Sequence, residues 1–255
     1  MDRDETKNAD TVRLVLMSDT HGEHRSLHVP NGDFLIHAGD FTLFNRSRAL
    51  VCDFDQWLLQ LPHRRKVVIP GNHDFKFANA SWRRLVSAAI FLLNEATEID
   101  GIRIWGSPLT PSNFESFGAR AGDDFRWIFS RIPRGTDLVI THGPPWGILD
   151  AGERSNRNEG CKHLLEAICR VAPALHVFGH IHHSYGSKWI GRTLFVNAAL
   201  AGPNYKLVRH PIVIEYDRRS RCVRGESRTM SRVTRHAKNL RLPEVPPISP
   251  IVAKF

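Results

Sequence analysis

Short apolar segments that each end in a polar motif are the feature of this chain that most restricts its fold. Five such segments lie at residues 12–17, 34–38, 67–69, 138–141 and 175–178. Nearly continuous apolar runs of this length are typical of buried strands. Patterns with a helical period separate them, at residues 48–61, 81–90, 123–132 and 161–171. Because strands alternate with helices, the sequence predicts an α/β domain whose sheet has parallel character.

Turn residues predict two hairpins as well. Asp100 and Gly101 tolerate the positive φ angles of a two-residue type I′ turn, which joins antiparallel strands. A second hairpin is expected around residues 190–192. Residues 206–216 resemble a strand interrupted by Pro211, which favours a place near a sheet edge.

Histidine, aspartate and asparagine side chains follow the apolar segments directly. They are Asp19 and His21, then Asp40, then Asn72 with His73 and Asp74, then His142, and finally His180 with His182. In open α/β sheets, the loops at the carboxyl ends of the strands converge on one crevice. A single motif of this kind is common by chance, and a lone His after a strand is usually a hydrogen-bonded core or rim residue. Five in succession indicate one shared site.

The donor atoms in these motifs suit a metal site. Asp19 and His21 are two residues apart, so on extended backbone they project to the same side, and His180 and His182 share that spacing. Oxygen and imidazole ligands without thiolate favour Mn²⁺, Fe or Zn²⁺. The carboxylate of Asp40 has two oxygens and can bridge two cations about 3.5–4 Å apart.

The ordered set D-x-H, G-D, G-N-H-D, H and G-H-x-H resembles the calcineurin-like metallophosphoesterase superfamily over roughly residues 12–216. The residues around Asp40, His142 and His176 resemble a subgroup called metallophosphoesterase-domain-containing proteins. Some animal members of that subgroup have Gly at the first His of the last motif, whereas this chain keeps His180. The resemblance implies a four-layer α/β/β/α sandwich of two mixed sheets.

The resemblance also implies a role for each motif residue. A first metal ion would be held by Asp19, His21 and His182, a second by Asn72, His142 and His180, and both by Asp40. The ions would be a divalent or mixed-valence pair of Mn, Fe or Zn. The family's nucleophile is a metal-bound hydroxide, which attacks phosphorus in line. His73 would be the general acid, with Asp74 orienting its imidazole.

Missing elements narrow the expected substrate. Serine/threonine phosphatases of the superfamily continue the G-D motif with D-R-G, and purple acid phosphatases place a Tyr three residues after the Asp, where this chain has Leu43. No globular length remains for the DNA-contacting domain of the nuclease members. The resemblance therefore implies a phosphodiesterase for small nucleotide-type substrates such as 2′,3′-cyclic nucleotides. A phosphomonoesterase and a non-catalytic metal-binding scaffold are the alternatives.

Other polar and aromatic residues are candidates for substrate contacts. Asn45 and Arg46 follow Asp40 on a loop, and His183 and Asn197 lie close to expected ligands in the sequence. Two tryptophans offer rings that could stack on a nucleobase, Trp105 and Trp146. Among the remaining histidines, His37 and His176 are expected in the core and His24 and His63 at the surface.

Charge is concentrated near the C-terminus. Of the net charge of +9, the stretch 218–241 carries +8, so the rest of the chain is nearly neutral. The sequence thus predicts a polar leader at 1–11, a catalytic domain at 12–217 and a basic, proline-containing tail at 218–255. The tail could contact nucleic acid or an anionic surface through counterion release, or it could be a solvated segment.

The compartment follows from the cysteines and from hydropathy. The four cysteines are scattered without a CxxC pair, and Cys161 and Cys169 lie in an apolar helical pattern, where buried free thiols are expected. No apolar run approaches the roughly 20 residues of a membrane span, and the first ten residues lack the apolar core of a signal peptide. We therefore expect the cytoplasm, with the nucleus as an alternative.

Overall fold

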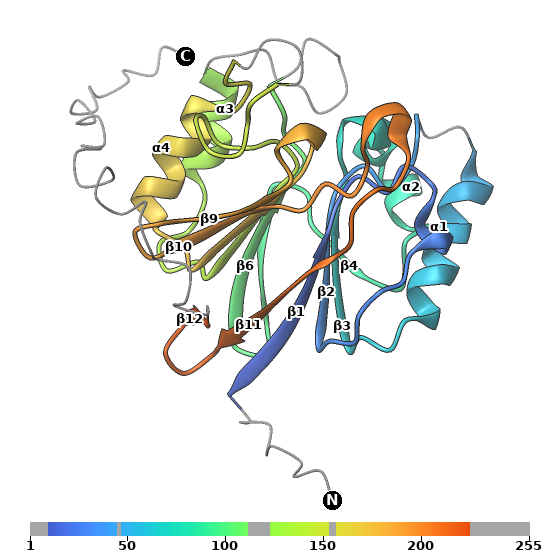
Figure 1. Cartoon of the computed structure of the whole chain (residues 1–255), viewed down its shortest axis with the longest axis horizontal. Helices are drawn as coiled ribbons and strands as arrows, with labels where there is room; N and C mark the ends of the chain where they lie inside the picture. The colour runs from blue at the N-terminus through green and yellow to red at the C-terminus, as the bar shows by residue number, and fades with distance from the viewer. Residues whose placement is uncertain (1–9, 45–46, 112–122, 153–156, 225–255) are drawn as a thin grey trace, which may run out of the picture. The chain divides into compact units, whose positions relative to one another are not determined.

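Two six-stranded sheets form the centre of the computed structural model, which describes residues 10–44, 47–111, 123–152 and 157–224 (Figure 1). The first sheet has the order β12-β11-β1-β2-β3-β4. Strands β1 to β4 are parallel, and β11 and β12 continue the sheet in antiparallel fashion. The strands are β1 (Thr11–Met17), β2 (Phe34–Ala38), β3 (Arg65–Ile69), β4 (Ile90–Phe91), β11 (Ile212–Asp217) and β12 (Cys222–Arg224).

The second sheet has the order β5-β6-β7-β8-β10-β9 and repeats this design. Strands β6, β7, β8 and β10 are parallel, and β5 and β9 pair antiparallel at the two ends. The strands are β5 (Glu95–Ile99), β6 (Ile102–Ser107), β7 (Leu138–Thr141), β8 (Leu175–Phe178), β9 (Gly186–Ile190) and β10 (Thr193–Asn197). Both predicted hairpins are confirmed, and Asp100 and Gly101 have the positive φ angles of 51° and 80° that their turn requires.

Helices cover the outer face of each sheet. The inner faces share one apolar cluster, in which Leu14 and Ile36 of the first sheet join Ile140 and Val177 of the second. Burying each such side chain contributes roughly 1.5–3 kcal/mol. Outside the first sheet lie α1 (Arg48–Gln60) and α2 (Ala80–Arg83), and outside the second lie α3 (Asp123–Ser130) and α4 (Lys162–Val171). The predicted four-layer sandwich is confirmed.

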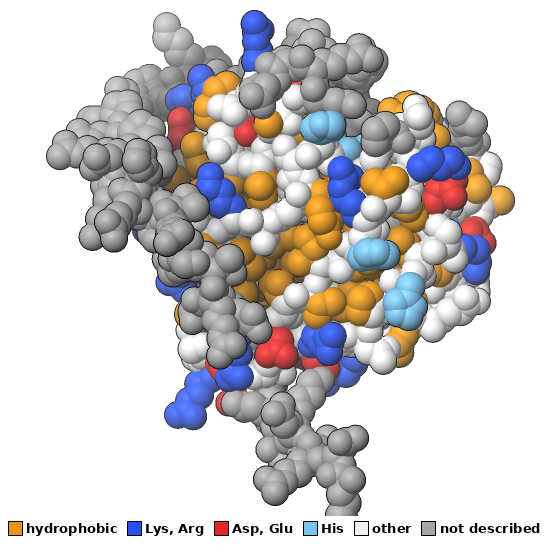
Figure 2. Space-filling view, viewed as in Figure 1, with side chains coloured by type: hydrophobic (Ala, Val, Ile, Leu, Met, Phe, Trp, Pro, Cys, Tyr) orange, Lys and Arg blue, Asp and Glu red, His pale blue; other side chains and the backbone are white. Residues whose placement is uncertain are grey.

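Apolar side chains also reach the surface along one side of the sandwich. Figure 2 shows them in the middle of the face on which β11 of the first sheet lies in Figure 1. Ile212 and Ile214 of β11 are half-buried and pack on the inner cluster. No helix among the described residues combines the length and apolar character that a membrane crossing requires.

The helix predicted at residues 81–90 is wrong, because α2 ends at Arg83 and residues 90–91 form β4. A long-range contact stops the helix. The carboxylate of Asp55, on α1, accepts hydrogen bonds from the backbone N–H groups of Ser87 and Ala88 and from the Ser87 hydroxyl. Those N–H groups are therefore engaged by a side chain rather than by helical carbonyls.

Two of the histidines expected at the surface are buried. His24 Nε2 lies 3.0 Å from Asp53 Oδ2, and His63 Nε2 donates to the carbonyl of Pro30 at 3.0 Å. Of the two cysteines expected to be buried, Cys161 is buried but Cys169 is exposed. The core positions predicted for His37 and His176 are confirmed, since both are fully buried.

The ordered sheet continues beyond the predicted end of the domain at residue 217. β12 pairs with β11, and three of the four arginines at residues 218–224 are engaged by other parts of this region. Arg221 forms an ion pair with Asp137 at 2.8 Å, Arg224 pairs with Asp217 at 2.5 Å, and Arg218 donates to the backbone of Asp100. These three charges are part of the fold, and the rest of the predicted tail lies outside the described residues.

Candidate metal centre

The loops after β1 and β2 bring Asp19, His21 and Asp40 to the same edge of the first sheet. The backbone N–H of Asp19 donates to the Gly39 carbonyl at 2.9 Å, and that of His21 donates to the Asp40 carbonyl at 2.9 Å. The parallel pairing of the two strands thus continues into the loops. His142 follows β7 and His180 follows β8 in the second sheet, and the His180 N–H donates to Asp19 Oδ2 at 3.0 Å. The predicted convergence of the motifs is what the structure shows.

Four of the expected ligands have left-handed backbone conformations. The φ angles are 57° for Asp19, 45° for His21, 54° for Asp40 and 67° for His180. Residues other than glycine rarely adopt such angles, which cost of order 1–3 kcal/mol each. Each strand therefore ends in a sharp change of direction that turns the side chain toward the crevice. The extended backbone predicted for Asp19 and His21 is therefore wrong.

Two motif glycines are explained by close approach. A Cβ atom added to Gly71 would overlap Asp40 Oδ1, and one added to Gly179 would overlap Asp19 Oδ2. Because the carboxylates lie directly against the backbone of these residues, no side chain fits there. The glycines before Asn72 and before His180 are thus requirements of the ligand geometry.

The first group of ligand atoms consists of Asp19 Oδ1, His21 Nε2 and His182 Nε2. The His182 nitrogen lies 3.2 Å from the Asp19 oxygen and 3.3 Å from the His21 nitrogen, and the His21 nitrogen lies 3.8 Å from the same oxygen. Ligands bound about 2.0–2.2 Å from one ion in tetrahedral or octahedral geometry are about 3.0–3.5 Å apart. The three atoms therefore have nearly the spacing of a shared coordination sphere.

The second group surrounds His142 Nε2, which lies 3.0 Å from Asn72 Oδ1 and 3.2 Å from Asp40 Oδ2. His142 Nδ1 donates to the carbonyl of Ala38 at 2.9 Å, so in the neutral imidazole Nε2 carries a lone pair. A ring nitrogen of His180 lies within 4.8 Å of the Asp40 and His142 atoms. Several acceptor atoms thus face one another, an arrangement that a cation stabilises.

Asp40 connects the two groups. Its Oδ1 accepts the backbone N–H of His73 at 2.8 Å, while Oδ2 faces His142. Asp40 also lies within 4.8 Å of ring nitrogens of His21 and His73. One carboxylate therefore belongs to the surroundings of both positions, as a bridging ligand must.

The carboxyls and most imidazoles of the two ligand groups have the charge states that binding of a cation requires. Burial acts to raise the pKa of both carboxyls, yet the surrounding imidazoles outweigh it, so the pKa of Asp19 is far below its usual range and that of Asp40 is about 2. Burial lowers the pKa of His21 and of His180 to about 4, which leaves them neutral at pH 7. Two buried carboxylates surrounded by lone pairs fit a pair of metal ions.

His142 behaves differently from the other imidazoles. Burial acts to lower its pKa, but the charge of Asp40 and the hydrogen bond to it outweigh burial and raise that pKa to about 9. A proton therefore occupies the space between His142 and Asp40 when no other cation does. A metal ion at this position must displace it.

The orienting role predicted for Asp74 is wrong. The Asp74 carboxylate accepts hydrogen bonds from the backbone N–H groups of Phe41, Thr42 and Gly71 and from the Thr42 hydroxyl, at 2.6–3.2 Å. His73 Nδ1 is buried without a hydrogen-bond partner among the described residues. Asp74 thus ties the loop that carries Asp40 to the loop that carries His73, and it does not contact the imidazole.

The other predicted contacts have mixed outcomes. His183 lines the pocket at the cluster, whereas the fully buried amide of Asn197 donates to the carbonyls of Leu149 and Ile181 and supports the loop before His182 instead of reaching a substrate. Asn45 and Arg46 lie outside the described residues. Trp105 is buried, and Trp146 is absent from the described lining of the pocket.

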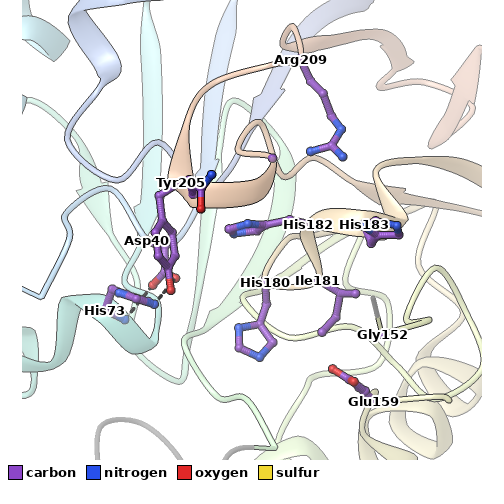
Figure 3. A pocket seen from close by; sticks show the side chains of 12 residues that line it. Asp40, His73, Gly152, Glu159, His180, Ile181, His182, His183, Tyr205 and Arg209 are labelled. Carbon is purple, nitrogen blue, oxygen red and sulfur yellow. Dashed lines mark hydrogen bonds and ion pairs between the residues drawn. The ribbon is translucent and has the colours of Figure 1, made fainter. Parts of the chain in front are cut away.

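Sequence reasoning missed several residues around this pocket, which has a volume of about 390 Å³. Tyr205 lies on the side of Asp40 and His73, while Arg209 and Glu159 lie across the pocket (Figure 3). The Arg209 guanidinium donates to the Ala201 carbonyl and lies 5.4 Å from the centre of a tyrosine ring. No polar motif marked these residues, because they come from loops of ordinary composition.

Two mixed sheets covered by helices, with a bridged cluster of acceptor atoms at their carboxyl ends, define a metal-dependent phosphoesterase. Comparison with known families agrees with this class. The chain belongs to the calcineurin-like phosphoesterase family, whose model matches residues 12–184.

Known relatives support the subgroup as well. The human protein "Metallophosphoesterase domain-containing protein 1" is 36% identical over 231 residues, a match that covers 80% of this chain and 71% of that protein. "UPF0046 protein K07C11.7" of Caenorhabditis elegans is 32% identical and covers 79% of this chain and 74% of its own length. Among solved structures, TT1561 of Thermus thermophilus has a TM-score of 0.53 at 14% identity, covering 84% of this chain and 97% of that chain, which shows the shared fold.

Proposed function

We propose that this phosphoesterase is a dinuclear phosphodiesterase that acts on small nucleotide-type substrates such as 2′,3′-cyclic nucleotides. The observation that carries the proposal is the pair of acceptor groups joined by the Asp40 carboxylate. Asp19, His21 and His182 would hold one ion and Asn72, His142 and His180 the other. The absence of thiolate from both groups favours Mn, Fe or Zn over softer ions.

The metal ions and His73 would have different roles in the reaction. The bound metals supply Lewis-acid stabilisation of phosphoryl charge and activate a water nucleophile. His73 Nε2 lies 3.9 Å from Asp40 Oδ2, so it would face a phosphate bound at the ions and would protonate the leaving oxygen. Burial is the main cause that lowers the pKa of His73, and Asp40 only partly opposes it. A lowered pKa makes the imidazolium a stronger acid but leaves a smaller fraction of His73 protonated at neutral pH, so acid catalysis by His73 should weaken as the pH rises.

The charge around the pocket supports a diester over a monoester. Arg209 is the only Lys or Arg among the described residues that line it, and Glu159 lines the same pocket. A monoester carries up to two negative charges near neutral pH, whereas a diester carries one. Beyond the metal ions themselves, the side chains of the lining therefore add little attraction for a second charge on the substrate. A volume of about 390 Å³ accommodates a second ester group.

One assay separates this function from both alternatives. Purified protein reconstituted with Mn²⁺ should hydrolyse bis-p-nitrophenyl phosphate and 2′,3′-cyclic AMP faster than p-nitrophenyl phosphate, and EDTA should abolish all three activities. Faster hydrolysis of p-nitrophenyl phosphate would favour the phosphomonoesterase. Tightly bound metal without hydrolysis of any of the three esters would favour the scaffold.

Contact with nucleic acid or an anionic surface through the basic stretch is a separate proposal. Arg218, Arg221 and Arg224 are engaged within the fold, so the exposed Arg219 and the positive charges at residues 228–241 would have to carry it. Binding of single-stranded RNA should then weaken steeply between 50 and 200 mM salt, because counterion release drives it. A flat response to salt would contradict this proposal.

A further inference from the structure

Two exposed aromatic rings contact the imidazole of His73. The ring centre of Phe44 lies 4.3 Å from that of His73, and the ring centre of Tyr205 lies 5.5 Å from it. Phe44 is 49% exposed and Tyr205 is 39% exposed. Large aromatic side chains usually gain stability by burial, so two of them left open beside the candidate general acid mark a surface that a ligand can cover.

The two rings reach this position from distant parts of the chain. Phe44 follows Asp40 in the loop after β2, and Tyr205 ends the short 3₁₀ helix Pro203–Tyr205 after β10. Both have left-handed backbones, with φ angles of 60° and 58°. Aromatic residues rarely adopt this conformation, so both side chains are held in place by a strained backbone.

Tyr205 also extends over the first ligand group. Its ring centre lies 4.7 Å from that of His21 and 5.9 Å from that of His182. In Figure 3 its ring lies on the side of Asp40 and His73, across the pocket from Glu159 and Arg209. It therefore contacts both imidazoles of the first ligand group and also that of His73.

The proposed function places the substrate relative to these rings. With the phosphate at the metal cluster and His73 facing the departing oxygen, the group attached to that oxygen would extend past His73 and lie against Phe44 and Tyr205. An apolar, flat group is the one that two aromatic faces bind best.

We propose that Phe44 and Tyr205 determine specificity by stacking on a planar ring in the leaving-group part of the substrate. The inference rests on the proposed function, because it uses His73 as the group that faces the leaving oxygen. The shared chemistry is a flat ring, which either a nucleobase or an aryl ester provides. Stacking of a base on one aromatic side chain changes affinity by about 5- to 150-fold.

A matched pair of substrates measures the contribution of the nucleobase ring. 2′,3′-Cyclic AMP and 1-O-methylribose 2,3-cyclic phosphate have the same reacting phosphodiester, but only the first carries a base. We expect Phe44→Ala and Tyr205→Ala each to lower kcat/KM for cyclic AMP by about 5- to 150-fold and to leave the base-free ester nearly unchanged. Tyr205→Phe should retain the wild-type preference, because it keeps the ring. Trp189→Ala is the matched control, since Trp189 is 46% exposed on β9 and, unlike Phe44 and Tyr205, has no ring contact with His73 among the described residues.

Bis-p-nitrophenyl phosphate distinguishes the two sources of the ring. A loss with this ester but not with cyclic AMP would assign the site to aryl groups, and a loss with cyclic AMP would assign it to nucleobases; both support stacking. An equal loss on cyclic AMP and on the base-free ester would overturn the proposal, since the rings would then only shape the catalytic centre. Metal content and the unfolding temperature of each variant show whether it has folded.

Binding provides a test that does not depend on turnover. Titration calorimetry on the Mn²⁺-loaded protein should give a dissociation constant for 3′-AMP that rises in both alanine variants, while the constant for inorganic phosphate stays within about twofold. If no ester is hydrolysed but 3′-AMP shows this pattern, the proposed function fails and the stacking site stands. If the two alanine variants bind 3′-AMP as the wild type does, the stacking site fails whatever the catalytic result.

Discussion

The two ligand groups of the metal centre share one carboxylate and are buried alike, but one histidine of each, His142 and His182, differ in how firmly they are held. In the second group, the side chain of His142 is 0% exposed, and the Ala38 carbonyl sets which of its nitrogens carries the proton. In the first group, the side chain of His182 is 22% exposed, and His21 Nδ1 has no hydrogen-bond partner among the described residues. Oriented, buried ligands bind a metal more tightly than loosely held ones. We therefore expect the second position to keep its ion and the first to exchange it.

Removing the charge that both groups share should have the largest effect. Asp40→Asn replaces the bridging carboxylate by a neutral amide, so both positions lose affinity together. We expect hydrolysis of bis-p-nitrophenyl phosphate to fall by about 10³-fold or more and both metals to be lost on dialysis. Elemental analysis measures the metal content, and Asp53→Asn, at an exposed carboxylate paired with Arg25, is the control. Retention of two ions by Asp40→Asn would show that it does not bridge.

Removing one ligand from each group tests the difference between them directly. His142→Ala should leave about one metal ion per chain, and excess Mn²⁺ should not restore activity, because a buried and oriented ligand is gone. His182→Ala should weaken the first position by about 10- to 100-fold, and excess Mn²⁺ should restore much of the activity. Activity measured during Mn²⁺ titration of each variant provides the comparison. If both variants recover to the same extent, the two positions do not differ as proposed.

His73 lies beside His21 and Asp40 but is not assigned as a ligand of either metal ion. We expect His73→Ala to slow turnover by about 10²- to 10⁴-fold while metal content stays unchanged, since it removes proton donation only. The loss should be greatest for esters with poor leaving groups such as 2′,3′-cyclic AMP, and smallest for bis-p-nitrophenyl phosphate. Loss of metal from this variant would instead make His73 a ligand.

The raised pKa of His142 predicts a pH dependence that belongs to the metal-free protein. An unfolded His has a pKa near 6.5, and that of His142 in the fold is about 9. The folded state therefore binds its proton more tightly, and the resulting stability is fully present below pH 6.5 and lost as the pH rises through 9. In EDTA-treated protein, we expect the free energy of unfolding to fall by a value of the order of 3 kcal/mol as the pH rises from 6.5 to 9.

Metal loading should remove this dependence, because the ion replaces the proton. Thermal unfolding of EDTA-treated and Mn²⁺-loaded protein between pH 6.5 and 9 measures both effects. Equal slopes in the two samples would contradict the view that proton and metal compete for one position.

The smallest effect is expected from Asp74, which supports the loops without touching the imidazole of His73. Asp74→Asn exchanges one acceptor oxygen for an amide NH₂ that faces N–H donors, so the free energy of unfolding should fall by about 1–3 kcal/mol. Turnover should fall equally for good and poor leaving groups, unlike in His73→Ala. A selective loss for poor leaving groups would restore the orienting role predicted from the sequence.

Most of the ligand set could be predicted because its signals are local. Each ligand follows an apolar strand by a few residues, and Gly71 and Gly179 precede Asn72 and His180 for steric reasons that leave a trace in the motif. The two hairpins were predictable for the same reason, since the turn residues alone favour them. Roles carried by contacts between distant segments were not: Asp74 and Asp55 act on the loop at 41–42 and on the turn at 87–88, far from them in the chain.

What the sequence by itself determined is the alternation of strands and helices and the identity of the polar residues at the strand ends, because both depend on neighbours within one element. Only the tertiary structure decided which side chains stand beside His73, which carbonyl orients His142, and which of the arginines belong to the fold. Those choices depend on how two sheets and their loops pack, and no local period or spacing encodes the distance between residues such as Phe44 and Tyr205.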